Sequence, residues 1–130
     1  MIVLFEKVER YLKTIEAFDG AAMGELLQRD FEQTEFPNAL NPLGQQSNRA
    51  DCLRRLETAR QILTRQRFEV TNHCESGDQV FVEAVWSGQM AVDAGPLKKG
   101  QELTAHFCIA FEFKDDLLFR QRNYNCFERL

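Results

Sequence analysis

The sequence predicts an α+β fold in which a strongly curved, cone-like antiparallel sheet wraps around N-terminal helices. Apolar residues recur three and four positions apart through much of the first half of the chain, and at every second position from about residue 67 onward. These are the periods of a helix face and of a strand face. Helices followed by a run of long strands favour an antiparallel sheet with the helices on one side. The expected order is two helices, one strand, one helix and four strands.

Two helices are predicted at the N-terminus. Apolar residues three and four apart mark an amphipathic helix from Leu4 to Phe18, with Tyr11 on its buried side. Asp19 and the glycine after it end this helix. Residues 21–28 then predict a short second helix that packs against the first.

One strand and a third helix follow. Residues 30–36 have strand character, and the prolines within residues 37–42 end that strand in a loop. Asn48 is a suitable N-cap with Asp51 three positions later, which predicts a third helix running to about Gln66. Its arginines are interspersed with acidic residues and are expected to form a solvated face: Arg49, Arg54, Arg55, Arg60 and Arg65.

The rest of the chain predicts four long strands. Residues 67–74 and 80–86 alternate in polarity around a Ser-Gly-Asp turn, so they form a hairpin. Residues 103–113 are apolar on both faces, as a central strand is. A Lys-Asp-Asp turn leads into a last strand over about residues 117–127.

Size and composition limit the classes of function. The 130 residues fit one domain, expected over residues 1–130. Sixteen basic against twenty acidic residues give a net charge of −4 without a basic stripe, which argues against a nucleic-acid partner. The apolar runs are too short for a membrane span or a signal peptide, so a cytoplasmic protein is expected. Eleven phenylalanines suit either the lining of a concave cavity or an ordinary core.

The four cysteines contain no C-x-x-C pair, which argues against a zinc site: Cys52, Cys74, Cys108 and Cys126. Each lies in an apolar run of a chain expected to be intracellular. We therefore expect four free, buried thiols rather than two disulfides. No metal and no cofactor is implied.

Several motifs together resemble a known family. They are the Arg-Tyr pair at 10–11, the Glu-Phe-Pro turn at 35–37, and Phe-Lys-Asp-Asp followed by Arg-Gln-Arg-Asn-Tyr-Asn near the C-terminus. In this order they resemble the ketosteroid isomerase and SnoaL-like branch of the nuclear transport factor 2 superfamily, over nearly the whole chain. The resemblance implies the cone-shaped, cystatin-like fold. It also implies roles for Tyr11 as an oxyanion donor and for Glu35 as a general base.

The residues around Glu35 support that role independently. Glu35 shares strand parity with Phe31 and Gln33, so if Phe31 faces the interior the carboxylate does too. Burial in an apolar pocket raises the pKa of a carboxyl group, as an acid or base near neutral pH requires. Two alternatives stay open. Glu35 could instead be a rim residue that caps the following turn, and Tyr11 could be a core tyrosine.

The departures from the resemblance are equally informative. The second oxyanion donor of ketosteroid isomerases, a protonated carboxylic acid, falls near Ile109, which cannot donate. The last-strand carboxylate of limonene epoxide hydrolases and of SnoaL-like cyclases falls near Asn123, and Asn125 does not supply one either. Steroid isomerisation and epoxide hydrolysis are therefore not expected from this chain. A cyclase mechanism that uses a carboxylate on the last strand is not expected either.

The candidate site combines Glu35 and Tyr11 as catalytic residues with a predicted pocket lining of Gln33, Trp86, Gln121, Asn123 and Phe31. His106 is a further candidate, although a lone strand histidine is more often packed or at an interface. The first functional hypothesis is a cofactor-free isomerase, cyclase or hydrolase acting by proton transfer on an apolar or polyketide-like molecule. The alternative is a non-catalytic module that binds an apolar small molecule or a partner.

The last two strands also predict assembly. One of their faces is apolar, and the other mixes small apolar residues with His106, Glu112, Arg120, Arg122 and Tyr124. Arginine and tyrosine are favoured at interfaces. We therefore expect a homodimer packed through the convex face of the sheet, as relatives of this family commonly are.

Overall fold

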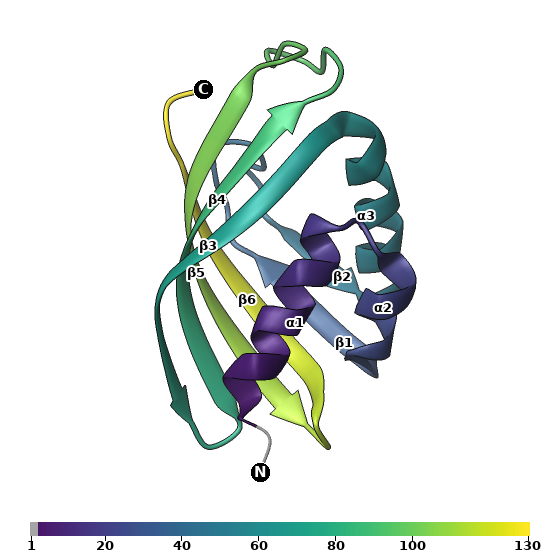
Figure 1. Ribbon diagram of the computed structural model, residues 1–130, viewed down its shortest axis with the longest axis vertical. Helices are drawn as coiled ribbons and strands as arrows, with labels where there is room; N and C mark the ends of the chain where they lie inside the picture. The colour runs from purple at the N-terminus through teal and green to yellow at the C-terminus, as the bar shows by residue number, and fades with distance from the viewer. Residues whose placement is uncertain (1–2) are drawn as a thin grey trace.

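A computed structural model describes residues 3–130 as three helices and a six-stranded sheet (Figure 1). The elements are α1 (Leu4–Glu16), α2 (Gly20–Glu25), β1 (Leu27–Glu35), β2 (Gln45–Asn48), α3 (Arg49–Ile62), β3 (Leu63–Ser76), β4 (Gln79–Met90), β5 (Glu102–Lys114) and β6 (Leu117–Phe127). The predicted α+β class and helix-first order are confirmed. No helix in the described part of the chain has the length and apolar character that a membrane crossing needs.

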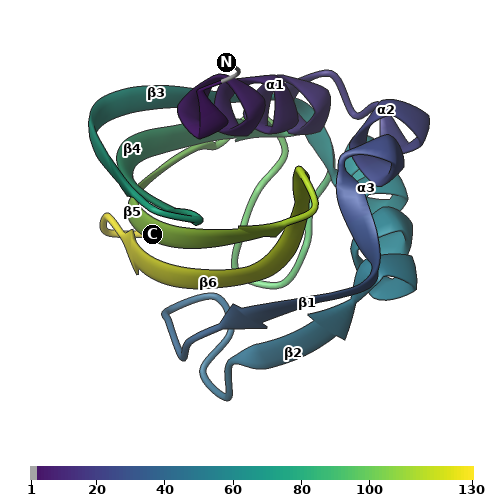
Figure 2. The same ribbon diagram turned by 90° about the horizontal axis from the view of Figure 1, so that it is seen from below.

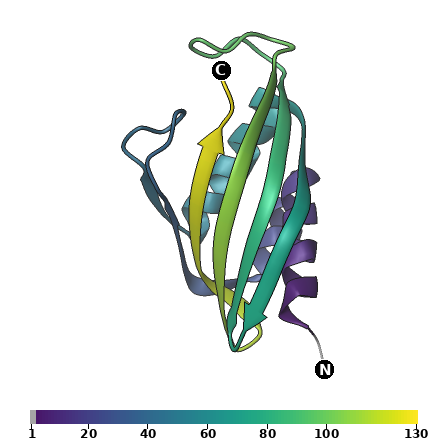
Figure 3. The same ribbon diagram turned by 90° about the vertical axis from the view of Figure 1, so that its left-hand side faces the viewer.

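The sheet has the strand order β2-β1-β6-β5-β4-β3. It curls strongly, with the helices on its concave side (Figure 2). The other face of the long strands looks outward without a helix over it (Figure 3). Neighbouring strands are antiparallel as predicted, except that β1 and β6 run parallel. Strand β2 was not predicted, because its four polar residues show no apolar alternation.

The two ends of α3 differ in how well they were predicted. The predicted cap at its start is confirmed, since the Asn48 side chain accepts from the backbone N–H of Asp51 at 2.8 Å and Asp51 accepts from Asn48 at 3.0 Å. The predicted end at Gln66 is wrong. Leu63 already has an extended backbone and begins β3, so Gln66 belongs to the sheet.

The concave face of the sheet and the inner face of α1 share one apolar core. Val8, Phe31 and Phe111 are wholly buried there, and Tyr11 and Leu12 of α1 are nearly so. The phenylalanines divide between two apolar clusters. Some fill this core, and others pack in a second cluster around Trp86: Phe68, Phe107 and Phe127.

A bulge in β3 changes which side chains face inward. Phe68 and Val70 face the helices, but the register shifts between Val70 and Asn72. The extra residue reverses the parity, so Asn72 and Cys74 lie on the convex face, contrary to the simple alternation. His73 turns to the helix side instead and stacks on Phe5, with 3.6 Å between the ring centroids.

All four cysteines are free, as expected, but only Cys52 is buried. Cys74, Cys108 and Cys126 are exposed. The expectation of burial was wrong for these three because their strand positions face outward, on the convex side of the sheet.

Candidate functional site

Strand β6 places a row of amide side chains on the concave face of the sheet. Gln121, Asn123 and Asn125 are two residues apart, so they point the same way. Gln121 and Asn123 are only 4% and 6% exposed. The Gln121 amide donates to Asn123 Oδ1 at 2.7 Å. These three side chains line a hollow on the concave side of the sheet, called the inner cavity below. Strand β6 thus gives this cavity a polar wall without an ionisable group.

Tyr11 closes the buried end of this row. Its hydroxyl donates to Gln121 Oε1 at 2.8 Å, and the side chain is 2% exposed. Burial raises the pKa of Tyr11 far above its ordinary value. Tyr11 is therefore a neutral hydrogen-bond donor, and its one proton is committed to Gln121.

Asn125 differs from its two neighbours. Its Oδ1 is buried and, among the described residues, is the one such side-chain atom without a hydrogen-bond partner. A buried acceptor left unpaired costs about 1–3 kcal/mol. Sites that keep such a group are candidates for ligand contact.

Glu35 lies at the end of β1, where its register partner on β6 is Asn123. It lines the same inner cavity as the amides and is half-buried. Its carboxylate also accepts from Asn38 Nδ2 at 2.8 Å. Glu35 therefore has features of both roles that the sequence left open. Its carboxylate lines the cavity, as a base would, and also accepts a hydrogen bond from the turn, as a rim residue would.

Gln33 of β1 and Arg55 of α3 also line the inner cavity. Gln33 of β1 accepts a hydrogen bond from the Cys52 thiol at 3.4 Å. The guanidinium of Arg55 donates to Ser47 Oγ and, more weakly, to Cys52 Sγ at 3.8 Å. Sequence reasoning missed Arg55, which was expected on the solvated face of α3 but lines the cavity.

Trp86 lines two separate hollows. Its indole N–H donates to Gln66 Oε1 at 3.0 Å, and its ring lies parallel to that of Phe107 with 6.0 Å between centroids. Trp86, Arg55 and Leu40 line both hollows. The inner one, about 330 Å³, contains the polar groups, and the outer one, about 490 Å³, is mainly apolar. These are ordinary sizes for small-molecule sites.

Most of the predicted site residues therefore come together. Six line the inner cavity: Tyr11, Gln33, Glu35, Trp86, Gln121 and Asn123. Phe31 does not. It has the predicted inward parity but lies four residues before Glu35, about 13 Å away along the strand, in the closed core.

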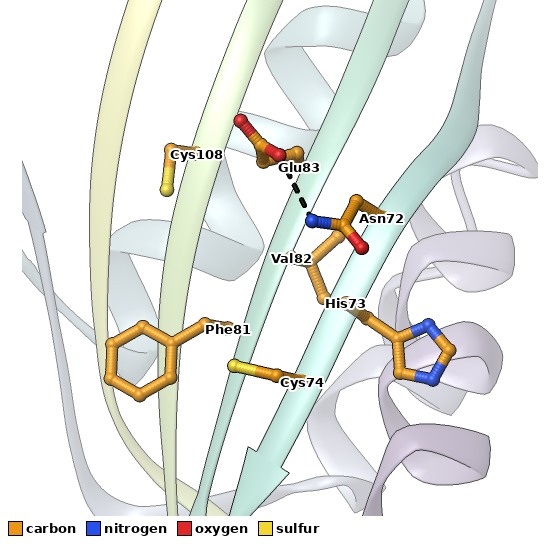
Figure 4. Close-up of a pocket in the computed structure, with 7 residues that line it drawn as sticks. All are labelled: Asn72, His73, Cys74, Phe81, Val82, Glu83 and Cys108. Carbon is orange, nitrogen blue, oxygen red and sulfur yellow. Dashed lines mark hydrogen bonds between the residues drawn. The ribbon is translucent and has the colours of Figure 1, made fainter.

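His106 also lies away from the cavity. It alternates with Phe107 on β5, so it faces the convex side, where its Nε2 lies 2.7 Å from Glu128 Oε2. That face has a smaller hollow of about 200 Å³. Figure 4 shows its side chains, with Asn72 donating to Glu83 Oε1 at 3.2 Å. In residues 3–130 no three His, Cys, Asp or Glu side chains gather as metal ligands would.

Comparison with known families agrees with this architecture. The family model described as the SnoaL-like domain matches residues 8–121. The chain belongs to the SnoaL-like family. No curated protein gives a significant sequence match to it.

Several solved structures have the same SnoaL-like fold. IdmH of Streptomyces antibioticus, a proposed polyketide cyclase, aligns with a TM-score of 0.80 at 14% identity, over 95% of this chain and 92% of its own. AclR of Streptomyces galilaeus, a proposed hydroxylase, gives 0.77 at 11% identity over 94% and 77%. An NTF2-like protein of Burkholderia pseudomallei gives 0.76 at 15% identity over 98% and 92%. At such identities the likeness establishes the fold alone.

The position of Trp86 yields a structural prediction at Gly88. A Cβ on Gly88 would lie 2.7 Å from Trp86 Cη2 and 2.8 Å from Cζ2. Gly88→Ala should therefore push the indole out of its place, alter its near-ultraviolet circular dichroism and cost about 1–3 kcal/mol in urea unfolding.

The matched control is Gly20→Ala, because a Cβ there would only reach Leu53 Cδ2 at 4.0 Å. It should leave the tryptophan signal unchanged. An unchanged signal in Gly88→Ala would contradict the tight contact.

Proposed function

We propose that this SnoaL-like protein binds an apolar, carbonyl-bearing small molecule in the concave cavity and moves a proton on it without a cofactor. The observation behind this proposal is that Glu35 is the only carboxylate among the described residues that line the inner cavity. Amide donors and apolar walls surround it. This is the composition that proton abstraction next to a carbonyl needs.

In the proposed reaction, the Glu35 carboxylate removes a proton from the carbon next to the carbonyl. The C–H electron pair moves into the new carbon–carbon double bond, and the carbonyl oxygen takes the negative charge as an enolate. Protonated Glu35 then returns the proton to a different atom, or the enolate carbon attacks a second carbonyl and closes a ring, and the alkoxide formed on that carbonyl takes the proton from Glu35. The first outcome is an isomerisation and the second a cyclisation.

The enolate oxygen needs hydrogen-bond donors. Because Ile109 occupies the place of an acidic donor, we assign this role to side-chain amides. The amino groups of Gln33, Asn123 and Asn125 have no protein acceptor within residues 3–130, and all three line the cavity. Fixed N–H donors in a site of low polarity stabilise a developing oxyanion more than they do in water.

Two features support a polyketide-like or other polycyclic ligand. The hollows are bordered by stacked aromatic rings, and the similar IdmH structure is described as a proposed polyketide cyclase. A non-catalytic binding role is the competing proposal. It is favoured by the hydrogen bond from Asn38, which already engages the Glu35 carboxylate.

Proton transfer can be tested with 2-acetylnaphthalene, an apolar ketone, by following deuterium uptake at its methyl group by NMR. We expect the wild type to accelerate the exchange. Glu35→Gln should lose about 10²–10⁴-fold of that acceleration while still binding the ketone, because general base catalysis contributes this much.

Glu32→Gln is the matched control, since Glu32 is an exposed residue on the same strand and pairs with Arg120 at 3.6 Å. Its exchange rate should equal that of the wild type. Binding of the ketone with no acceleration by the wild type would reject catalysis and leave the binding module.

Assembly is a second part of the proposal. Phe81 is 37% exposed and Tyr124 47% exposed on the convex face, where Tyr124 stacks on Phe36 with 4.7 Å between centroids. Exposed aromatics beside the Arg122–Glu112 ion pair have the composition of an interface. We propose a two-fold homodimer in which this face meets its own copy.

Light scattering at micromolar concentration should then give about twice the chain mass of 15.1 kDa. Phe81→Glu, which places a charge on that face, should shift the mass toward the monomer. A monomeric wild type would reject this assembly, and a dimer indifferent to Phe81→Glu would move the interface elsewhere.

A further inference from the structure

Arg55 is placed where a ligand in either hollow would meet it. It extends from α3 toward the sheet and lines both the inner polar hollow and the outer apolar one. Its side chain is half-buried. Its protein contacts are the Ser47 hydroxyl and the Cys52 thiol.

Neither contact neutralises the guanidinium. A serine hydroxyl is uncharged, and burial raises the pKa of the Cys52 thiol, which keeps it protonated at neutral pH. Within residues 3–130 no carboxylate lies at ion-pair distance from Arg55. Of the neighbouring arginines of α3, Arg54 pairs with Asp51 and Arg60 with Glu57, while Arg49 donates to the backbone carbonyl of Gly24.

A half-buried guanidinium without an anion is costly for a fold to keep. Arginine has five N–H donors in a fixed fork and stays charged at all ordinary pH values. Removing such a group from water without an acceptor is unfavourable. The fork matches a planar carboxylate through two parallel hydrogen bonds. The arrangement suits an oxyanion supplied from outside the chain.

The outer hollow indicates the chemistry of the rest of the ligand, beyond the oxyanion that Arg55 would bind. Its volume is about 490 Å³, and apolar side chains make most of its lining, including Ile62, Leu63, Met90, Leu97 and Leu103. Arg55 is one of three residues that line both this hollow and the inner one. A molecule that fills the outer hollow and reaches Arg55 would be mostly apolar with one anionic group.

We infer that the cavity selects an apolar organic acid, with its carboxylate on Arg55 and its body in the outer hollow. This inference rests on the proposed function, because it assumes that the concave cavity is the ligand site. Glu35 reinforces the orientation. Its negative charge disfavours the carboxylate at the inner end and leaves that end to a neutral carbonyl.

The test compares two probes that differ in charge and hardly in shape, 2-naphthoate and 2-acetylnaphthalene. We would measure their affinities by calorimetry for the wild type, Arg55→Met and the control Arg54→Met, which lies next to Arg55 but is exposed and paired with Asp51. Arg55→Met should weaken the affinity for 2-naphthoate at least tenfold and leave the affinity for 2-acetylnaphthalene unchanged. Arg54→Met should affect neither probe.

A second variant and a stability measurement separate recognition from a structural role. Arg55→Lys keeps the charge without the fork and should fall between wild type and Arg55→Met for 2-naphthoate. The urea midpoint of Arg55→Met should equal or exceed that of the wild type, since an unmatched charge is removed. A lowered urea midpoint of Arg55→Met, together with an equal loss of affinity for the two probes, would overturn the inference.

The outcomes also distinguish this inference from the proposed function. If 2-acetylnaphthalene binds but 2-naphthoate affinity does not depend on Arg55, only the selection of an acid is rejected. If neither probe binds the wild type, the concave cavity as an apolar ligand site is rejected, and the inference fails with it.

Discussion

The buried hydrogen bond between Tyr11 and Gln121 organises both the core and the cavity. It joins α1 to β6, two elements at opposite ends of the chain, at a point that water does not reach. Below it the side chains are apolar, and Phe111 packs edge-on against the Tyr11 ring with 5.9 Å between centroids. Either polar group without the other would be a buried, unpaired group that costs about 1–3 kcal/mol.

The same bond determines which atoms face the ligand space. Because Tyr11 donates to Gln121 Oε1, the Gln121 amino group points to Asn123 Oδ1. The amino group of Asn123 is then left toward the cavity, next to Glu35 in the strand register. A donor on the first helix therefore sets the direction of a chain of amides on the last strand. Low surrounding polarity strengthens each bond in that chain.

The sequence was sufficient for the parts of this arrangement that follow strand alternation. Glu35 and Gln33 were expected to face inward from their parity with Phe31, whereas Asn123 entered the predicted pocket through the family resemblance. Alternation indicates which face of the sheet a side chain lies on, but not whether it lies in the cavity or in the closed core. Phe31 was therefore assigned to the pocket although it lies in the closed core. The bulge after Val70 and the short polar strand β2 leave no signal in the apolar pattern.

Arg55 was missed for a different reason. The arginines of α3 occur on all sides of a helix whose buried positions are few, so the sequence does not separate the arginine that faces the sheet from those paired in solvent. Only the packing of α3 against β1 and β2 makes that distinction. The cysteines were misjudged similarly, because every strand of this sheet has an outward face as well, and Cys74, Cys108 and Cys126 lie on it.

The central claim is that the concave cavity, and not the convex face, is the working site. Trp86 is the one tryptophan of the chain, so its indole N–H gives a single resonance in a ¹H–¹⁵N spectrum. Titration with 2-acetylnaphthalene should shift that resonance together with the side-chain amides of Gln33 and Asn123, and leave the amide of Asn72 on the convex face unmoved. Shifts confined to Asn72 and its neighbours, with Trp86 unchanged, would contradict the account.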